Sequence, residues 1–364
     1  MAKNIFNMKR IFTLRFMLIS LFAAMGMAMN AETIKYNYGL FGYNLDTETK
    51  TAALAWYKGS PRVVTIPESV THDDVTYSVT SLGEGCFWDC KALTSIDIPS
   101  SVTSLGRQCF EGCKSLTSVT IPSSVTSLGD YCLSGCSSLT SIDIPSSVTS
   151  LGNYCFSDCS SLTSIDIPSS VTSLGEGCFS GCESLTSITV DENNPVYDSR
   201  ENCNAIIETG SNTMIAGCAS TSIPSSVTSL GSYCFNGCES LTSINIPSSV
   251  TRLGDYCFSN CKSIKTMTCE IPTAIEGNFF RETLIDYATL YVPESSLDSY
   301  KATSPWSSFG TILPISTTGI GETATNGVSG IDAIYDIEGK RCNGTNRGLS
   351  IIRMSDGTTR KVLK

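Results

Sequence analysis

Hydrophobic residues return at a fixed interval through the middle of this chain. From Leu93 the sequence reads LTSIDIPSSVTSLGRQCFEGCKS, and the same 23-residue pattern begins again one period later. Full copies start at Leu93, Leu116, Leu139, Leu162 and Leu241, an interrupted copy starts at Leu185, and degenerate copies start at Arg62 and Ile264. Spacing, residue type and order all recur, so the pattern predicts an array of equivalent structural units.

Each unit predicts one strand followed by a turn and a short helical segment. Leu93, Ile96 and Ile98 point inward from the strand, while the polar residues between them face solvent. Pro99 ends the strand because it cannot donate a ladder hydrogen bond. Phe110, in the segment RQCFEGC, is predicted to enter the core from a helical turn on the opposite side.

A period between about 20 and 29 residues with this pattern is typical of leucine-rich repeats. One unit cannot enclose a core alone, so neighbouring units must stack. The predicted fold class is an α+β repeat solenoid, a right-handed leucine-rich-repeat coil with one strand row, short helical turns and β-rich caps at both ends. One position forms a predicted internal column of Phe87, Phe110, Phe156, Phe179, Phe235 and Phe258, with Leu133 as the one substitution.

The pattern divides the chain into six predicted segments. They are a signal peptide (1–31), an N-terminal β-hairpin cap (32–61), the solenoid (62–271, interrupted at about 191–219), a C-terminal cap (272–315), a linker (316–327) and a C-terminal β-module (328–364). Within the interruption, NAIIETGSNTMIAGC predicts a hairpin. Trp56 and Trp306 are predicted to cover the two open ends of the strand stack.

The first thirty residues predict export. Lys3, Lys9 and Arg10 precede an apolar run, Phe16–Met29, which small residues follow. A transmembrane anchor is the alternative, but the run is shorter than the roughly 20 residues that a spanning helix needs. The mature protein is therefore predicted to be exported to the cell surface or the extracellular space, and not to span a membrane.

Composition narrows the classes of partner. Charged residues make up 16% of the chain and the net charge is −10. Binding to nucleic acid is excluded, because it would need clustered Lys and Arg to neutralise phosphates. The sequence also lacks residues arranged for catalysis. The single histidine, His72, is followed by Asp73 and Asp74 in a predicted solvated turn, and no catalytic motif is present. The sequence predicts no enzyme, no cofactor and no metal site.

The eighteen cysteines need their own explanation. Fourteen form seven C-x3-C pairs, from Cys86/Cys90 to Cys257/Cys261. Residues four apart on a helical turn have Cβ atoms roughly 5–6 Å apart, whereas a disulfide needs about 3.5–4.5 Å. Buried free thiols are therefore favoured. Some disulfides, with Cys203 and Cys218 as the best pair, and zinc bound by thiolates remain as alternatives.

The phrase IPSSVTSLGxxCFxxC resembles the BspA-like (Treponema pallidum-type) leucine-rich repeats of bacterial surface proteins, over residues 62–315. That family usually carries Ala where this chain repeats Cys, as at Cys109. The resemblance implies attachment to host extracellular-matrix proteins, glycans or other bacterial surface molecules. The final residues resemble the sorting segments recognised by the type IX secretion system, which implies contact with that secretion machinery. A small capping β-module is the alternative.

Two surfaces are candidates for binding. The first is a concave strand face of polar side chains that recur in each unit, comprising Thr94, Ser95, Asp97, Thr117, Ser118, Thr120, Thr140, Ser141, Asp143, Thr163, Ser164, Asp166, Thr186, Ser187, Thr189, Thr242, Ser243 and Asn245. The second is an aromatic stripe of Tyr131, Tyr154, Tyr233 and Tyr256. Adhesion through such a surface and a spacer or display scaffold without a ligand are the two functions that remain open.

Overall fold

The structure is a computed structural model that describes residues 33–315 in full. Beyond these, it describes the backbone of four strands at 331–335, 341–342, 349–354 and 359–363. The chain divides into two compact units, Met1–Ile312 and Leu313–Lys364. The predicted signal peptide and linker lie outside the described residues.

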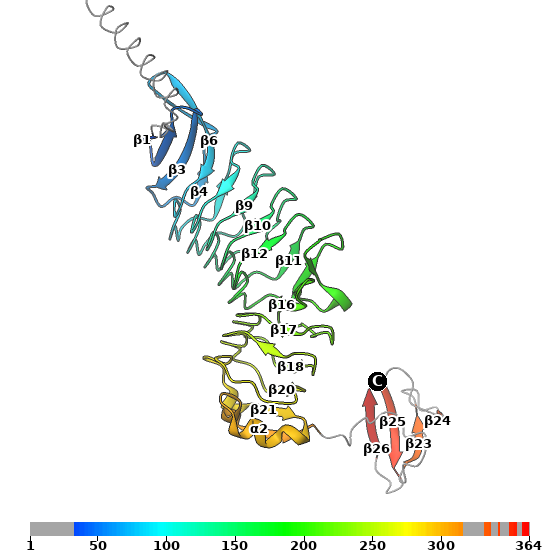
Figure 1. The fold of residues 1–364 in the computed structure, drawn as a ribbon. Helices are drawn as coiled ribbons and strands as arrows, with labels where there is room; N and C mark the ends of the chain where they lie inside the picture. The colour runs from blue at the N-terminus through cyan, green and yellow to red at the C-terminus, as the bar shows by residue number, and fades with distance from the viewer. Residues whose placement is uncertain (1–32, 316–330, 336–340, 343–348, 355–358, 364) are drawn as a thin grey trace, which may run out of the picture. The chain divides into compact units, whose positions relative to one another are not determined.

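The first unit is a solenoid whose coils follow one another in chain order from β4 to β21 (Figure 1). The predicted fold class is confirmed, with very little helix in the described part of the chain. The helical elements are η1 (Arg200–Asn202), η2 (Ile285–Tyr287), η3 (Glu294–Ser296), α2 (Leu297–Ala302) and η4 (Trp306–Ser308).

Before the first coil, three antiparallel strands form the N-terminal end of the unit. They are β1 (Thr33–Tyr38), β2 (Phe41–Asp46) and β3 (Thr51–Tyr57). β3 then pairs in parallel with β6 (Val75–Leu82), which also forms a hairpin with β5 (Ser69–His72). This sheet covers the end of the stack, because β6 continues into the strand row of the coils.

The coils carry two rows of parallel strands rather than the single row that was predicted. The first row, at the L-x-x-I-x-I positions, contains β4 (Val63–Thr65), β7 (Ser95–Asp97), β11 (Ser164–Ile167), β13 (Ser187–Val190), β18 (Ser243–Ile246), β20 (Thr266–Cys269) and β21 (Thr289–Val292). The second row contains β8 (Ser104–Leu105), β9 (Ser127–Leu128), β10 (Ser150–Leu151), β12 (Ser173–Leu174), β17 (Ser229–Leu230) and β19 (Arg252–Leu253).

The segment around each Cys pair is a series of hydrogen-bonded turns and not the predicted helical turn. The residue before the first Cys has a left-handed backbone, with φ of 56° at Tyr131 and 55° at Gln108. A left-handed residue cannot continue a right-handed helix. The backbone groups bond to the next coil instead, as where Phe110 N donates to Cys132 O at 2.8 Å.

The predicted column of aromatic side chains runs through the core. Phe87 and Phe110 stack with ring centroids 5.4 Å apart, and Phe235 and Phe258 stack at 5.2 Å. Leu133, the one substitution, is fully buried in the same column. The inward strand positions pack around the column, so each coil contributes one aromatic or leucine side chain and several aliphatic ones to the core, which divides into two clusters at the interruption.

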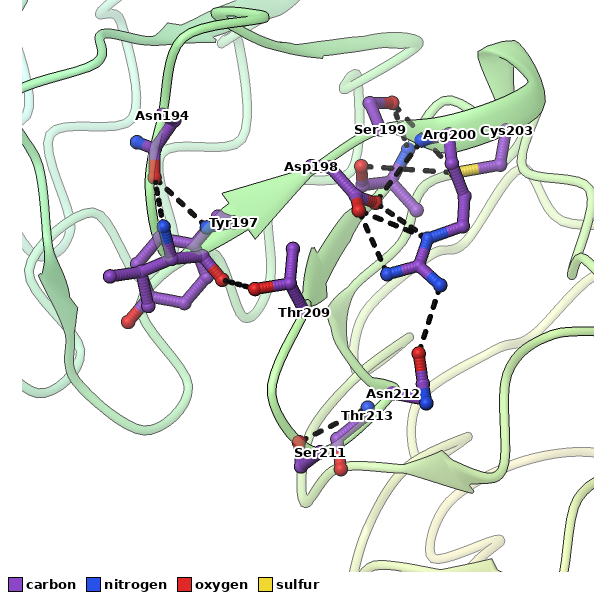
Figure 2. Close-up of polar contacts among 12 residues, drawn as sticks. Asn194, Tyr197, Asp198, Ser199, Arg200, Cys203, Thr209, Ser211, Asn212 and Thr213 are labelled. Carbon is purple, nitrogen blue, oxygen red and sulfur yellow. Dashed lines mark hydrogen bonds and ion pairs between the residues drawn. The ribbon is translucent and has the colours of Figure 1, made fainter.

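The interruption folds as the predicted hairpin and becomes part of the stack. It contains β14 (Tyr197–Asp198), β15 (Ile206–Glu208) and β16 (Thr213–Ala216), and β16 pairs in parallel with β17 of the next coil. Figure 2 shows how Arg200 ties its two sides together, with Nε 2.9 Å from a carboxylate oxygen of Asp198 and Nη1 2.9 Å from Oδ1 of Asn212.

Asn194 anchors the interruption to the preceding coil. Its side-chain amide donates to the carbonyl oxygens of Pro168 and Val171, and its Oδ1 accepts from the backbone N–H groups of Val196 and Tyr197. The last two contacts are drawn in Figure 2. The bond to Val171 O replaces the one that a serine side chain makes in regular coils, as where Ser147 Oγ donates to Val125 O.

The C-terminal end of the solenoid is closed by β21, α2 and β22 (Thr311–Pro314). Trp306 is fully buried there, and its indole N–H donates to Ile275 O at 2.7 Å. Phe280 and Tyr300 pack against the same indole ring, each with a centroid separation of 5.2 Å. The cap therefore shields the last coil with aromatic side chains.

The second unit contains an antiparallel sheet of four strands in its described part. Its strand order is β24 (Arg341–Cys342), β23 (Ile331–Tyr335), β25 (Leu349–Met354) and β26 (Thr359–Leu363). The sequence predicts a β-module at residues 328–364, and these four strands lie within that range.

Truncating the aromatic column should disrupt several coils together. We expect Phe156→Ala to lower the free energy of unfolding by roughly 3–5 kcal/mol, because it leaves a cavity in a closely packed core. Phe156→Leu is the matched control, since the preceding coil buries Leu133 at the same position, and it should cost much less. Urea denaturation followed by circular dichroism measures both. A Phe156→Ala protein that unfolds like the parent would show that the column does not hold the coils together.

Candidate functional site

The predicted strand face lies on the first strand row. In β7 and β11 the inward residues are buried, and Ser95, Asp97 and Asp166 alternate with them on the outer side. Parallel pairing in register brings equivalent residues together, so that Asp166 of β11 stands beside Thr189 of β13. Within one sheet, stacking therefore does align the predicted polar rows.

In four units the hydroxyl of the first threonine is already bonded, although the sequence predicted it to be free for a ligand. The hydroxyl donates to a backbone carbonyl of the preceding coil, from Thr94 to Arg62 O at 2.8 Å, from Thr117 to Thr94 O at 3.4 Å and from Thr163 to Thr140 O at 3.3 Å. Thr186 makes the same bond to Thr163 O. This row therefore couples coils, and the serine and the Asp, Asn or Thr beyond it remain as the exposed chemistry of the face.

The interruption also divides the predicted face. Beyond β13 the side chain of Asn204 takes the place of a strand, donating to Thr186 O at 2.7 Å and accepting from Ile188 N at 2.6 Å. Thr242, Ser243 and Asn245 then belong to a separate sheet that starts at β18. The eighteen predicted residues therefore form two faces, one on each side of the interruption.

A pocket opens on the first of these faces. It has a volume of about 350 Å³ and spans three successive coils, with Asp143, Asp166 and Thr189 at equivalent positions and Asp191 at its edge. The hydroxyl of Thr189 donates to the Asp166 carboxylate. Within residues 33–315, no three acidic, histidine or cysteine side chains are arranged to hold a metal ion. The pocket can therefore offer carboxylate acceptors to a ligand that carries hydrogen-bond donors.

The predicted tyrosine stripe is continuous across the interruption. Ring centroids lie 5.1 Å apart between Tyr131 and Tyr154, 5.5 Å between Tyr154 and Tyr233, and 5.3 Å between Tyr233 and Tyr256. Each of the four has a left-handed backbone, with φ between 53° and 60°. The guanidinium of Arg107 lies 5.9 Å from the Tyr131 ring and covers one end of the stripe. In the stacked pairs, neighbouring rings cover one another's faces.

A groove beside this stripe was not anticipated from the sequence. It runs over the second strand row, has a volume of about 550 Å³, and is lined by the Ser-Leu-Gly positions of three coils with Asp130, Asn153 and Glu176. Oδ1 of Asp130 accepts from Asn153 N, and Oδ1 of Asn153 accepts from Glu176 N. The signal was present in the repeat, because the residue after the Ser-Leu-Gly triplet is an acid or an amide in each of these coils.

The cysteines line the core and bond across coils. The second Cys of a pair donates its S–H to a carbonyl of the preceding coil, as from Cys113 to Phe87 O at 3.2 Å and from Cys159 to Leu133 O at 3.3 Å. All seventeen described cysteines are free, including Cys203 and Cys218. The Sγ of Cys218 faces Asn204 O at 3.6 Å, so the structure has no bond between this best predicted pair.

Burial changes the acidity of these thiols. Loss of solvation raises the pKa of the Cys113 and Cys159 thiols from 9.0 to about 12. A thiol that holds its proton at neutral pH is a poor nucleophile and a poor metal ligand. His72, predicted to lie in a solvated turn, is the last residue of β5 and lies beside the Tyr36 ring, with its Nε2 3.6 Å from a carboxylate oxygen of Asp73.

These features define a class of protein: a leucine-rich-repeat solenoid with extended polar surfaces. The model of the BspA type leucine rich repeat region matches six copies, over residues 80–207 and 202–300, so the chain belongs to the BspA-type leucine-rich-repeat family. No curated protein matches it. In the described part of the chain, no helix is both long and apolar enough to cross a membrane.

Several solved structures are similar to this chain. A leucine-rich repeat protein from Bacteroides ovatus is 25% identical, with 77% of this chain and 76% of that chain covered and a TM-score of 0.52. The Treponema pallidum leucine-rich repeat protein is 22% identical, covering 64% of this chain and 91% of that one, with a TM-score of 0.44. A leucine rich cell surface protein from Faecalibacterium prausnitzii is 23% identical, covering 80% and 97%, with a TM-score of 0.44.

Raising the pH should destabilise the solenoid through its buried thiols. The folded state holds the protons of Cys113 and Cys159 up to about pH 12, whereas an unfolded thiol loses its proton near pH 9. The contribution of these thiols to stability should therefore be constant below about pH 9 and fall between pH 9 and 12, by about 1.4 kcal/mol per pH unit for each such thiol. Urea midpoints between pH 7 and 11 measure this slope.

The matched control is the double variant Cys113→Ala and Cys159→Ala, whose stability should fall less steeply with pH. A thiol titration of the unfolded protein without reductant provides the reference state, and most of the cysteines should react. A titration that finds few free thiols, or equal slopes for parent and variant, would contradict buried free thiols as the source of the pH dependence.

Proposed function

We propose that this protein is exported to the bacterial cell surface and binds macromolecules there through its solenoid, as an adhesion protein. The observation that carries the proposal is the pocket of about 350 Å³ across three coils, with Asp143, Asp166 and Thr189 at its surface. A pocket that repeats the same polar position three times is a feature that an extended ligand can use.

The ligand class follows from the chemistry of this pocket. Carboxylates and hydroxyls accept hydrogen bonds, so a partner rich in N–H or O–H donors is expected. Host extracellular-matrix proteins, glycans and the surface molecules of other bacteria all meet this condition. Membership of a family of surface proteins, and a similar solved structure described as a leucine rich cell surface protein, support an exposed location.

A spacer or display scaffold is the second candidate function. It is favoured by the threonine row, since hydroxyls such as those of Thr94 and Thr163 are used to couple coils. A protein selected only to hold its shape would use its repeated residues in this way. The two functions differ in whether the remaining exposed positions of the strand face bind anything.

Substituting the pocket carboxylates separates the two functions. We expect the purified mature protein to bind immobilised matrix proteins or glycans saturably, and Asp143→Asn with Asp166→Asn to weaken binding at least about tenfold. The control is Asp255→Asn with Asp286→Asn, which makes the same charge change at exposed positions away from the pocket. Surface plasmon resonance measures the affinities. Equal losses in both variants, or no binding by the parent, would count against the strand-face proposal and favour the scaffold.

The export route is a second part of the proposal. A signal peptide at residues 1–31 directs the chain out of the cytoplasm, and the C-terminal module is recognised by a type IX secretion system. The support is the basic and apolar start of the chain, together with the short β-strands between Ile331 and Leu363.

Removing the C-terminal module should therefore block surface display. In a bacterium with a type IX system, deletion of residues 328–364 is expected to leave the protein in the periplasm, as measured by fractionation and surface biotinylation. Replacing residues 316–327 with a Gly/Ser sequence of equal length is the control and should preserve display. Undiminished surface labelling of the deletion variant would show that the module is a cap and not a sorting signal.

A further inference from the structure

The tyrosine stripe has one missing member. Tyr154 N donates to Glu176 O at 2.9 Å, and Gly181 N donates to Asn236 O at 2.9 Å, so one coil lies between those of Tyr154 and Tyr233. That coil carries Gly177 at the tyrosine position. Two strand spacings amount to about 10 Å, yet the ring centroids of Tyr154 and Tyr233 are only 5.5 Å apart. The two rings therefore lean together over Gly177.

The geometry of this pair differs from the rest of the stripe. Tyr131 and Tyr154 stack at an interplanar angle of 13°, whereas Tyr154 and Tyr233 meet edge to face at 78°. A Cβ placed on Gly177 would lie 2.5 Å from Cε1 of Tyr154. The ring of Tyr154 thus fills space that a side chain at position 177 would need. If both rings took the orientation of the stacked pairs, the space between them would accept one six-membered ring.

An unsatisfied hydroxyl lies at the base of this space. Ser180 is 8% exposed, and its Oγ, 3.1 Å from the Cβ position of Gly177, has no hydrogen-bond partner among the described residues. The equivalent serines of the two preceding coils, Ser134 and Ser157, bond to each other at 2.8 Å. A buried hydroxyl without a partner is costly, so Ser180 indicates a position where a ligand or a water supplies the missing bond.

The interruption creates the room around Ser180. In a regular coil Phe156 N donates to Cys178 O, but one coil later the carbonyl of Cys234 accepts from Gly217 of the inserted segment. This leaves a cavity of about 10 Å³ lined by Gly177, Ser180 and Tyr233 among others. A space of that size holds one water molecule or one hydroxyl group.

Hydrogen-bond acceptors continue outward from this point. Glu176 precedes Gly177 and forms one end of the groove of about 550 Å³ that also contains Asn153 and Asp130. Loss of solvation, and then the hydroxyl of Tyr233, raise the pKa of Tyr154, with a smaller contribution from the Glu176 carboxylate. The carboxylate and the two phenol rings are therefore close neighbours around Gly177.

We propose that this notch, formed by Tyr154, Glu176, Gly177, Ser180 and Tyr233, binds one pyranose unit of a glycan. The sugar ring separates the two tyrosines and packs its C–H face on a phenol ring, one hydroxyl reaches Ser180, and the rest of the glycan follows the groove. An aromatic side chain of a protein partner would fit between the rings, but it would leave Ser180 unsatisfied. The notch is separate from the strand-face pocket, so each of the two proposed binding sites can be tested without the other.

Filling the missing position tests the proposal. Gly177→Tyr completes the stripe with a residue that the same backbone conformation already carries elsewhere, since φ is 60° at Gly177 and 56° at Tyr131. Gly85→Tyr is the matched control, because Gly85 holds the equivalent position in another coil with the same φ of 60°. The probe is an array of immobilised neutral oligosaccharides of hexoses and N-acetylhexosamines, followed by titration calorimetry with the best binder.

We expect the parent and Gly85→Tyr to bind equally, and Gly177→Tyr to bind at least about tenfold more weakly. Thermal melting shows whether both tyrosine variants remain folded. Binding by Gly177→Tyr as tight as that of the parent, or binding lost in the Asp143→Asn/Asp166→Asn protein but kept in Gly177→Tyr, would overturn the proposal. An array that captures nothing would overturn it as well.

Ser180→Ala provides a second and milder variant. Because it removes an unsatisfied hydroxyl, it should leave the melting temperature unchanged or raise it, while it weakens oligosaccharide binding. Ser157→Ala, which breaks the pair with Ser134, should lower the melting temperature and leave binding unchanged. A Ser180→Ala protein with unaltered affinity would overturn the assignment of this hydroxyl to the ligand.

Discussion

A hydrogen bond from a side chain of one coil to a backbone carbonyl of the coil before it holds this solenoid together. It recurs at several positions of the repeat, with Thr163 bonded to Thr140 O, Ser147 to Val125 O and Cys159 to Leu133 O. These bonds use carbonyls that a smooth stack of short strands would leave without a second partner. They explain why serine, threonine and cysteine recur so strictly. These hydroxyls and thiols stabilise the stack of coils, so a ligand can bind only through side chains that do not make such bonds.

Periodicity alone was sufficient to predict the stacked coils and the aromatic column. A position that returns every 23 residues with Phe or Leu can only be an inward one. The second strand row and the turns were harder to predict, because they depend on backbone conformation. A left-handed Tyr131 or Gln108 looks like an ordinary helical residue in the sequence. The hydrogen bonds of the threonine hydroxyls were also not predicted. The repeat pattern places these side chains on the solvent side of the strand, but it does not show that a backbone carbonyl of the preceding coil lies within reach.

The interruption has opposite effects on the two candidate surfaces. Through Asn204 it ends the first strand row and divides the predicted face. Through Gly217 it wedges apart two coils that remain adjacent at Gly181, and so leaves Ser180 without a partner beneath the tyrosines. The residues that interrupt the repeat are therefore the ones that make particular coils differ from their nearly identical neighbours. The sequence could not reveal this, because Gly177 reads as one more variation at a variable position.

The coil-to-coil bonds also bear on how such a protein changes over generations. Each regular coil contacts the coil before it and the coil after it through the same atoms, at separations of 22, 23 or 26 residues. A whole repeat can therefore be duplicated or lost by recombination between its near-identical copies without leaving any donor or acceptor unmatched. The length of the protein is thus free to drift by whole coils, while the interruption and the two caps stay as fixed landmarks. Variants that differ by whole coils would carry the same surface chemistry on solenoids of different length.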